Sequence, residues 1–144
     1  FMADRAEHAE KTVLPALELG QHVVTDRWAY SSLVYQGYGR GLDVGELRRI
    51  SDWATNGLWP DVVVLLDVSL EVGAERRGER DAEQDHFELA GMQLQSQVVE
   101  GYHQLADADP HHWRVVDGNG LMEEVEARVW AVVEPFLERD SCTL

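Results

Sequence analysis

The residues best suited to chemistry follow His22–Asp26, a β-branched run that we expect to form a short buried strand. Asp26 and Arg27 stand at its carboxyl end, where an Asp can hold a magnesium ion or its waters and an Arg can clamp a phosphate. Polar side chains that suit a flat ligand such as a nucleobase follow at helical spacing, in Ser31, Ser32, Tyr35 and Gln36. The same residues are also compatible with a salt-bridged Asp–Arg pair followed by a polar helix start.

Helices must flank this segment. Met2–Leu19 has apolar residues at three- and four-residue steps, is expected to kink at Pro15, and is ended by Gly20. Asp43–Asn56 is predicted to be a second helix because Asp43 with Glu46 resembles a capping box. Further along, the pattern predicts a helix from Ser69 to about Arg77, a polar loop over 78–85, and helices over 87–108 and 122–137.

Two more strands complete the pattern. Val62–Asp67 is a continuous apolar run, which implies cover on both faces, and Trp113–Asp117 is the third strand. Alternating strands and helices predict an α/β fold with a parallel sheet. Ligands of such sheets bind beyond the carboxyl ends of the strands. No G-x-x-x-x-G-K-[ST] phosphate loop occurs in the sequence, and its only lysine, Lys11, lies in the first helix.

Composition sets limits on the function. A chain of 144 residues is about one domain. The longest apolar run is too short for a membrane span, no secretory leader is visible, and the single Cys142 allows no internal disulfide, so we expect a cytoplasmic protein. Adjacent His111 and His112 would point to opposite faces of a strand, which argues against a metal hydrolase.

The charge balance restricts the partners. Asp and Glu total 27 against 12 Lys and Arg, a formal net charge of −15, which repels nucleic acid and anionic membranes at long range. We therefore expect neither as a partner. A locally positive site for a small anion remains compatible with this balance.

Combined motifs resemble the thymidylate kinase family over essentially the whole chain. They comprise Phe1–His8, Asp26-Arg27 with Ser31-Ser32 and Tyr35-Gln36-Gly37, then Gly39-Arg40-Gly41, and Pro60-Asp61 before a strand that ends at Asp67. The resemblance implies an α/β fold of the three-layer P-loop nucleoside monophosphate kinase type. It also implies transfer of the γ-phosphoryl group of MgATP to dTMP, giving dTDP.

The resemblance implies a role for each matching residue. Phe1 would stack on thymine, Arg5 would donate to a thymine carbonyl, and Ser31, Ser32 and Gln36 would read the base edge. Arg27 would hold the acceptor's monophosphate, with Asp26 near the metal and the transferring phosphoryl. Tyr35 would lie near the sugar's 2′ position, and Tyr102 would approach the sugar from the long helix.

The same resemblance makes the basic loop around residues 75–80 a lid over the donor phosphates. Its candidate catalytic residues are Arg76, Arg77 and Arg80. In place of the family's usual Asp-Arg-Phe-Glu, this chain has Asp85-His86-Phe87-Glu88, and a histidine is only partly charged near pH 7. Any phosphate contact from position 86 should therefore weaken or depend on pH.

The family begins with a strand, a phosphate-binding loop, a helix and a second strand that this sequence does not contain. We therefore expect residues 1–144 to be a single, incomplete domain with the acceptor site, the lid and the C-terminal part of the core, a parallel sheet lacking its first two strands, and no kinase activity alone. The alternatives are a related deoxynucleoside or nucleotide kinase and a non-catalytic nucleotide-binding or dimerisation module. A homodimer could use the helices that carry Trp28, Tyr38 and Trp53.

Overall fold

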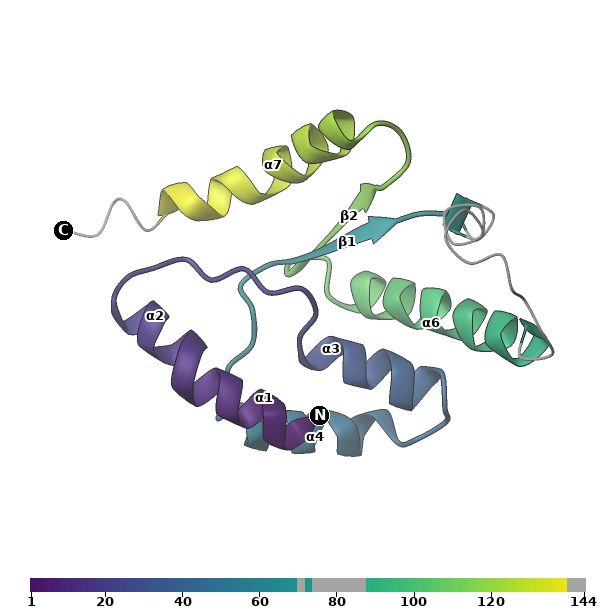
Figure 1. The fold of residues 1–144 in the computed structure, drawn as a ribbon, viewed down its shortest axis with the longest axis horizontal. Coiled ribbons are helices and arrows are strands. Elements are labelled where there is room, and N and C mark those ends of the chain that lie inside the picture. The colour runs from purple at the N-terminus through teal and green to yellow at the C-terminus, as the bar shows by residue number, and fades with distance from the viewer. Residues whose placement is uncertain (70–71, 74–87, 140–144) are drawn as a thin grey trace. The chain divides into compact units, whose positions relative to one another are not determined.

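The computed structural model describes residues 1–69, 72–73 and 88–139, which belong to two compact units, Phe1–Pro60 and Asp61–Leu144. The first unit contains α1 (Met2–His8), η1 (Ala9–Val13), α2 (Leu14–Glu18), α3 (Ala29–Ser32), η2 (Leu33–Tyr38) and α4 (Val44–Ala54) (Figure 1). The second contains β1 (Val63–Asp67), α6 (Glu88–Ala108), β2 (Trp113–Asp117) and α7 (Met122–Arg139). Whether the whole chain is a single domain stays a prediction.

The first predicted helix is confirmed as the continuous series α1, η1 and α2. Its middle segment η1 is a π-helix that ends two residues before Pro15. Pro15 has no N–H to donate to the preceding turn, and a wider turn is one way in which a helix accommodates that loss. The series ends at Gly20, whose φ of +71° favours a residue without Cβ.

The predicted helix over 43–56 is also confirmed, as α4. The Asp43 carboxylate caps it by accepting from the backbone N–H of Glu46 at 2.7 Å. Gly57, with a φ of +75°, follows its end. The core of this unit is formed where α3 and η2 pack on α4, with fully buried Ala29, Leu33, Val34 and Ser51.

The second unit is built on two parallel strands. β1 and β2 pair in the register Val63↔Trp113 to Asp67↔Asp117, so both strands end in an aspartate on the same rung. Helices α6 and α7 lie on opposite sides of the pair (Figure 1). This confirms the predicted α/β class with a parallel sheet.

Just past the strands, the segments that follow β1 and β2 approach each other closely. The Gly118 N–H donates to the Asp67 carbonyl at 2.8 Å. A Cβ at position 118 would lie 2.7 Å from a Val68 methyl carbon. A larger residue at position 118 would therefore force Val68 to shift.

The predicted strand over His22–Asp26 is wrong: the structure gives this segment no regular secondary structure, and Val24 is 94% exposed. A strand forms only when its backbone pairs with a neighbour, and the sheet of the described residues consists of β1 and β2 alone. The expected cover of Val62–Asp67 on both faces is likewise incomplete, since Leu66 is 49% exposed. The helix and loop predicted over 69–85 lie almost entirely outside the described residues.

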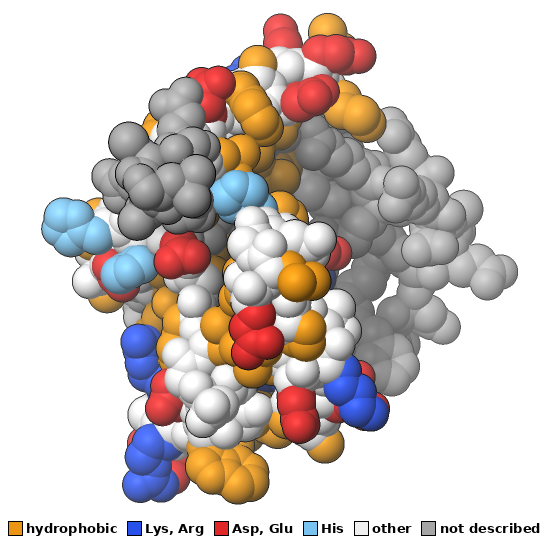
Figure 2. Space-filling model, turned by 90° about the vertical axis from the view of Figure 1, so that its left-hand side faces the viewer, with side chains coloured by type: hydrophobic (Ala, Val, Ile, Leu, Met, Phe, Trp, Pro, Cys, Tyr) orange, Lys and Arg blue, Asp and Glu red, His pale blue; other side chains and the backbone are white. Residues whose placement is uncertain are grey.

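Large hydrophobic side chains are exposed in both units, among them Trp53 on α4 and Met122 and Trp130 on α7. Figure 2 shows one face of the molecule, on which hydrophobic side chains lie between acidic and basic ones. No helix in the described ranges combines the length and the apolar character needed to cross a membrane.

Candidate functional site

Arg27 is the centre of the candidate site in the first unit. Its backbone is left-handed, with a φ of +69°, an unusual conformation for a residue that carries a Cβ. Its guanidinium carbon lies 5.2 Å from the centre of the Tyr35 ring, within the range of a cation–π contact. The side chain is exposed. The structure thus brings together two of the residues that the sequence predicted, with a solvent-accessible positive charge.

Neighbouring contacts hold the chain around Arg27. The Thr25 hydroxyl donates to the carbonyl of Arg27 at 3.0 Å. On the other side, the Trp28 indole N–H donates to the Leu58 carbonyl at 3.0 Å, and the Trp28 ring contacts the edge of His8 with centroids 5.9 Å apart. The segment from Thr25 to Trp28 is therefore attached both to itself and to distant parts of the unit.

Arg5 lies beside the same segment. Its Nη2 donates to the Trp28 carbonyl at 3.5 Å, and its Nη1 to the Met2 sulfur at 3.4 Å. Partial burial lowers the pKa of Arg5 because it removes water from the guanidinium, and the neighbouring Asp4 opposes this effect. An arginine stays protonated at neutral pH nonetheless. The carbonyl of Trp28, the residue after Arg27, thus accepts from a second cation.

The polar residues after Arg27 fall on α3 and η2. Ser31, Tyr35 and Gln36 are half-buried, whereas Ser32 is only 4% exposed and lies beside core residues. The segment 33–38 is π-helical, closed by the Gly39 N–H on the Val34 carbonyl at 2.8 Å. Short π-helical turns are frequent at functional sites because they change where side chains point.

Asp26 is exposed and is the one predicted metal ligand. The described ranges contain no cluster of three or more His, Cys, Asp or Glu side chains that could hold a metal ion. Magnesium is commonly bound through one or two carboxylates, with water and substrate phosphates completing the shell. Asp26, adjacent to the cationic Arg27, therefore fits as a single ligand and not as a complete site.

Of the remaining predicted residues, Phe1 belongs to the first unit, Tyr102 belongs to the second, and the others lie outside the described residues. Phe1 precedes α1 and is 86% exposed. Tyr102 belongs to α6 in the second unit, where its ring lies 6.3 Å from that of Trp113. The lid arginines Arg76, Arg77 and Arg80 lie outside the described residues, as does His86.

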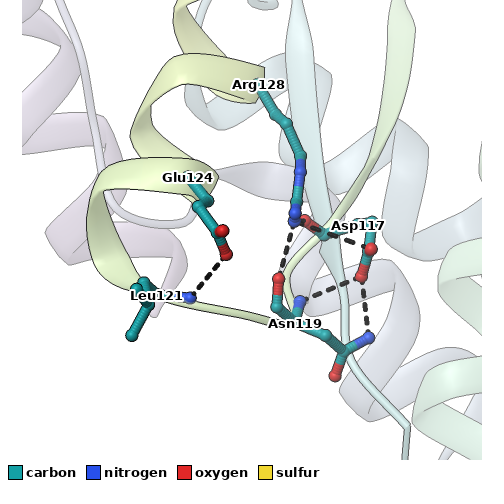
Figure 3. Close-up of polar contacts among 5 residues, drawn as sticks. All are labelled: Asp117, Asn119, Leu121, Glu124 and Arg128. Carbon is teal, nitrogen blue, oxygen red and sulfur yellow. Dashed lines mark hydrogen bonds and ion pairs between the residues drawn. The ribbon is translucent and has the colours of Figure 1, made fainter.

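A second polar cluster follows β2 (Figure 3). Arg128 of α7 donates to the carbonyls of Asp117 and Asn119, at 2.8 and 2.6 Å. The Asp117 carboxylate accepts from the Asn119 backbone and side chain, at 2.9 and 2.7 Å, and these hydrogen bonds lower the pKa of Asp117. Glu124 accepts from the Leu121 N–H at 3.0 Å. The loop after β2 is thus fixed by α7.

Beside this loop lies an open, largely apolar cavity of about 590 Å³, lined by residues that include Leu66, Val68, Gly118, Met122, Val125 and Trp130. At the end of β1, the Asp67 carboxylate pairs with His103 of α6 at 3.3 Å. The sequence indicated Asp67 through its place at a strand end, but gave no sign of the cavity or of Arg128.

Sequence reasoning also gave no site role to Thr25 or Trp28. In the sequence, Thr25 is the residue before the Asp-Arg pair, and Trp28 is an aromatic that suits self-association. A hydroxyl two residues before a left-handed residue is the signal that points to Thr25. The sequence does not predict the left-handed conformation of Arg27, so this signal cannot be recognised from sequence.

Comparison with known proteins identifies the fold. The crystal structure of thymidylate kinase from Ehrlichia chaffeensis superposes with a TM-score of 0.70 at 26% identity, covering 92% of this chain and 60% of that one. The fold is accordingly that of part of a P-loop nucleoside monophosphate kinase.

Sequence relatives narrow the class. The family described as thymidylate kinase matches residues 1–129. Thymidylate kinases from Synechococcus sp. (strain JA-2-3B'a(2-13)) and Thermomicrobium roseum are 43% and 44% identical, over 95% and 96% of this chain. The chain belongs to the thymidylate kinase family. It spans about two thirds of the length of these relatives, 65% and 66%.

Proposed function

We propose that residues 1–60 form the acceptor site for dTMP in a kinase that transfers the γ-phosphoryl group of MgATP to dTMP, giving dTDP. The observation that supports this most directly is the exposed Arg27 guanidinium over the Tyr35 ring. A second cation, Arg5, donates to the carbonyl of the following residue, Trp28. A planar guanidinium recognises phosphate through two parallel N–H groups.

In this proposal Arg27 binds the acceptor's monophosphate and Arg5 donates to a thymine carbonyl. Ser31 and Gln36 read the base edge, and Tyr35 disfavours a 2′-hydroxyl. Ser32 contributes less because it is buried. Phe1 stacks on the base, which agrees with its 86% exposure. Phosphoryl transfer depends mainly on positioning the reactants and on stabilising the negative charge of the transferring phosphoryl group. In this proposal these residues position the acceptor nucleotide.

Further residues complete the proposal: Asp26 belongs to this unit, and the others lie outside it. Tyr102 approaches the sugar, and Arg76, Arg77 and Arg80 supply positive charge to the donor phosphates. Asp26 would hold Mg²⁺ or its waters, and the ion, when bound, would neutralise charge on the phosphate oxygens. We also propose that the protein forms a homodimer. We expect it in the cytoplasm, where dTMP and ATP are its substrates.

Calorimetry on the 144-residue chain tests the acceptor site. We expect binding of dTMP in preference to dUMP and dGMP, and a loss of at least tenfold in dTMP affinity in Arg27→Ala, since a hydrogen bond to a charged group contributes about 1.5–3 kcal/mol. Arg49→Ala is the matched control, because Arg49 is exposed and paired with Glu46 on α4. Equal affinity for all three nucleotides, or an unchanged Arg27→Ala, would contradict the proposal.

Turnover is a separate question. The 144 residues contain no G-x-x-x-x-G-K-[ST] motif to cradle ATP phosphates, so we propose that this polypeptide binds dTMP without phosphorylating it. A coupled assay of ADP formation with dTMP and MgATP measures this directly. Robust turnover would refute this part of the proposal and leave the acceptor site standing.

A further inference from the structure

The left-handed backbone of Arg27 needs something to maintain it. A residue with a Cβ is disfavoured at a φ of +69°, and such a conformation persists only where its surroundings fix it. Arg27 is exposed, so packing of its own side chain in a core does not provide this. Besides the contact of its side chain with the Tyr35 ring, the restraint comes from contacts of the adjacent residues.

Three hydrogen bonds act on the residues around Arg27, two of them downstream and one upstream. Downstream, Trp28 is anchored by its indole N–H on Leu58 and by Arg5 on its carbonyl. Upstream, the Thr25 hydroxyl reaches past Asp26 and donates to the carbonyl of Arg27 itself. This upstream bond acts on the peptide plane that immediately follows the left-handed residue, so it restrains the ψ rotation of Arg27.

We propose that Thr25 is a positioning residue for Arg27: its hydroxyl fixes the Arg27 carbonyl, and this keeps the guanidinium over the Tyr35 ring, where it meets the ligand's phosphate. The inference rests on the proposed dTMP site and adds to it a residue that acts on the phosphate through Arg27. Without the hydroxyl, the turn can relax toward ordinary backbone conformations, and the guanidinium must be ordered again at each binding event.

The test compares Thr25→Val, which removes the donor at nearly constant shape, with Thr25→Ser, which retains it. We expect Thr25→Val to weaken dTMP binding about threefold to tenfold, consistent with one hydrogen bond, and Thr25→Ser to stay within twofold of the original chain. Thymidine, which lacks the phosphate, should bind all three proteins equally. Thr12→Val, an exposed threonine on η1, is the control and should change neither affinity.

A readout without ligand separates this inference from the proposed function. The Tyr35 ring should shift the side-chain NMR signals of Arg27, which are assigned by their loss in Arg27→Lys. We expect this shift to collapse in Thr25→Val and to persist in Thr25→Ser. An unchanged ring-current shift in Thr25→Val, or equal losses for dTMP and thymidine, would overturn the positioning role. Failure of the original chain to bind dTMP would overturn the proposed function alone.

Discussion

At the scale of single residues, the contact between Arg27 and Tyr35 joins two recognition tasks. The face of the Tyr35 ring is electron-rich and attracts the Arg27 guanidinium. We also propose that the Tyr35 side chain borders the sugar. A change in Tyr35 should therefore affect both the phosphate and the sugar.

Substitution of Tyr35 tests this. We expect Tyr35→Phe to retain dTMP binding because the ring face remains. Tyr35→Leu should lose roughly 0.5–1 kcal/mol, about twofold to fivefold in affinity, and should discriminate less against the ribonucleotide. Titration calorimetry with dTMP and its ribose analogue measures both effects. Full discrimination in Tyr35→Leu would contradict the assigned role.

The lowered pKa of Asp117 predicts how the stability of the fold depends on pH. Hydrogen bonds from Asn119 hold its pKa below the ordinary value of 3.8, so folding favours the ionised form. This stabilising contribution is fully present above pH 3.8 and is lost as the pH falls from there through the lower pKa of the folded state.

Urea unfolding at pH 6 and near pH 3 checks this. We expect Asp117→Asn to lose less stability on acidification than the original chain. Asp109, whose pKa is lowered mainly by a hydrogen bond with His112, leaves the variant some dependence on pH. Identical acid sensitivity of the two proteins would show that Asp117 is not a source of it.

At the scale of elements, α4 offers a direct test of local sequence signals. Asp43→Ala removes the carboxylate that caps the helix and should lower the free energy of unfolding by about 1 kcal/mol, whereas Asp43→Ser should restore most of it. Thermal and urea unfolding measure this, with Thr12→Val as the surface control. An unaltered midpoint in Asp43→Ala would mean that water replaces the cap.

Elements with local determinants were predictable. The cap at Asp43 and the glycine after α4 were correct from sequence, and Trp113–Asp117 was predicted with the bounds that the structure gives to β2. The strand expected at His22–Asp26 was not, because a β-branched run is only a preference and pairing depends on a distant partner. The π-helical turns were also missed, since only the position of Pro15 hinted at one.

The candidate site, too, has features that could be predicted from the sequence and features that could not. Residue types gave Arg27 and Tyr35, because an arginine after an aspartate and a tyrosine at helical spacing are visible in the sequence. The left-handed turn at Arg27, its restraint by Thr25, and the attachment of Trp28 to Leu58 depend on contacts that sequence spacing does not encode. The burial of Ser32 on α3, a helix that packs on α4, also depends on contacts that sequence spacing does not encode.

At the scale of the whole molecule, exposed aromatic surface bears on self-association. Trp53 on α4 is 86% exposed beside Ile50 at 44%, whereas Trp28 already uses its indole within the unit. We therefore expect the predicted homodimer to depend on Trp53 more than on Trp28.

Sedimentation velocity across a concentration series tests this. Trp53→Ser should shift a dimer toward monomer, by tenfold or more in dissociation constant if Trp53 is central to the contact. Trp130→Ser, on the exposed surface of α7, is the matched control and should leave the equilibrium unchanged. A chain that is monomeric at all concentrations would remove the homodimer from the proposal.

Lack of space at Gly118 has a consequence for how the second unit tolerates change. The hydrogen bond from Gly118 to Asp67 extends the ladder one step beyond the paired strands, at a point where even a methyl group has no room. We expect an alanine at position 118 to push apart the two segments that follow β1 and β2. These segments lead toward residue 69 and into α7. The glycine at this rung therefore lets the two segments stay hydrogen-bonded for one step after they leave the sheet.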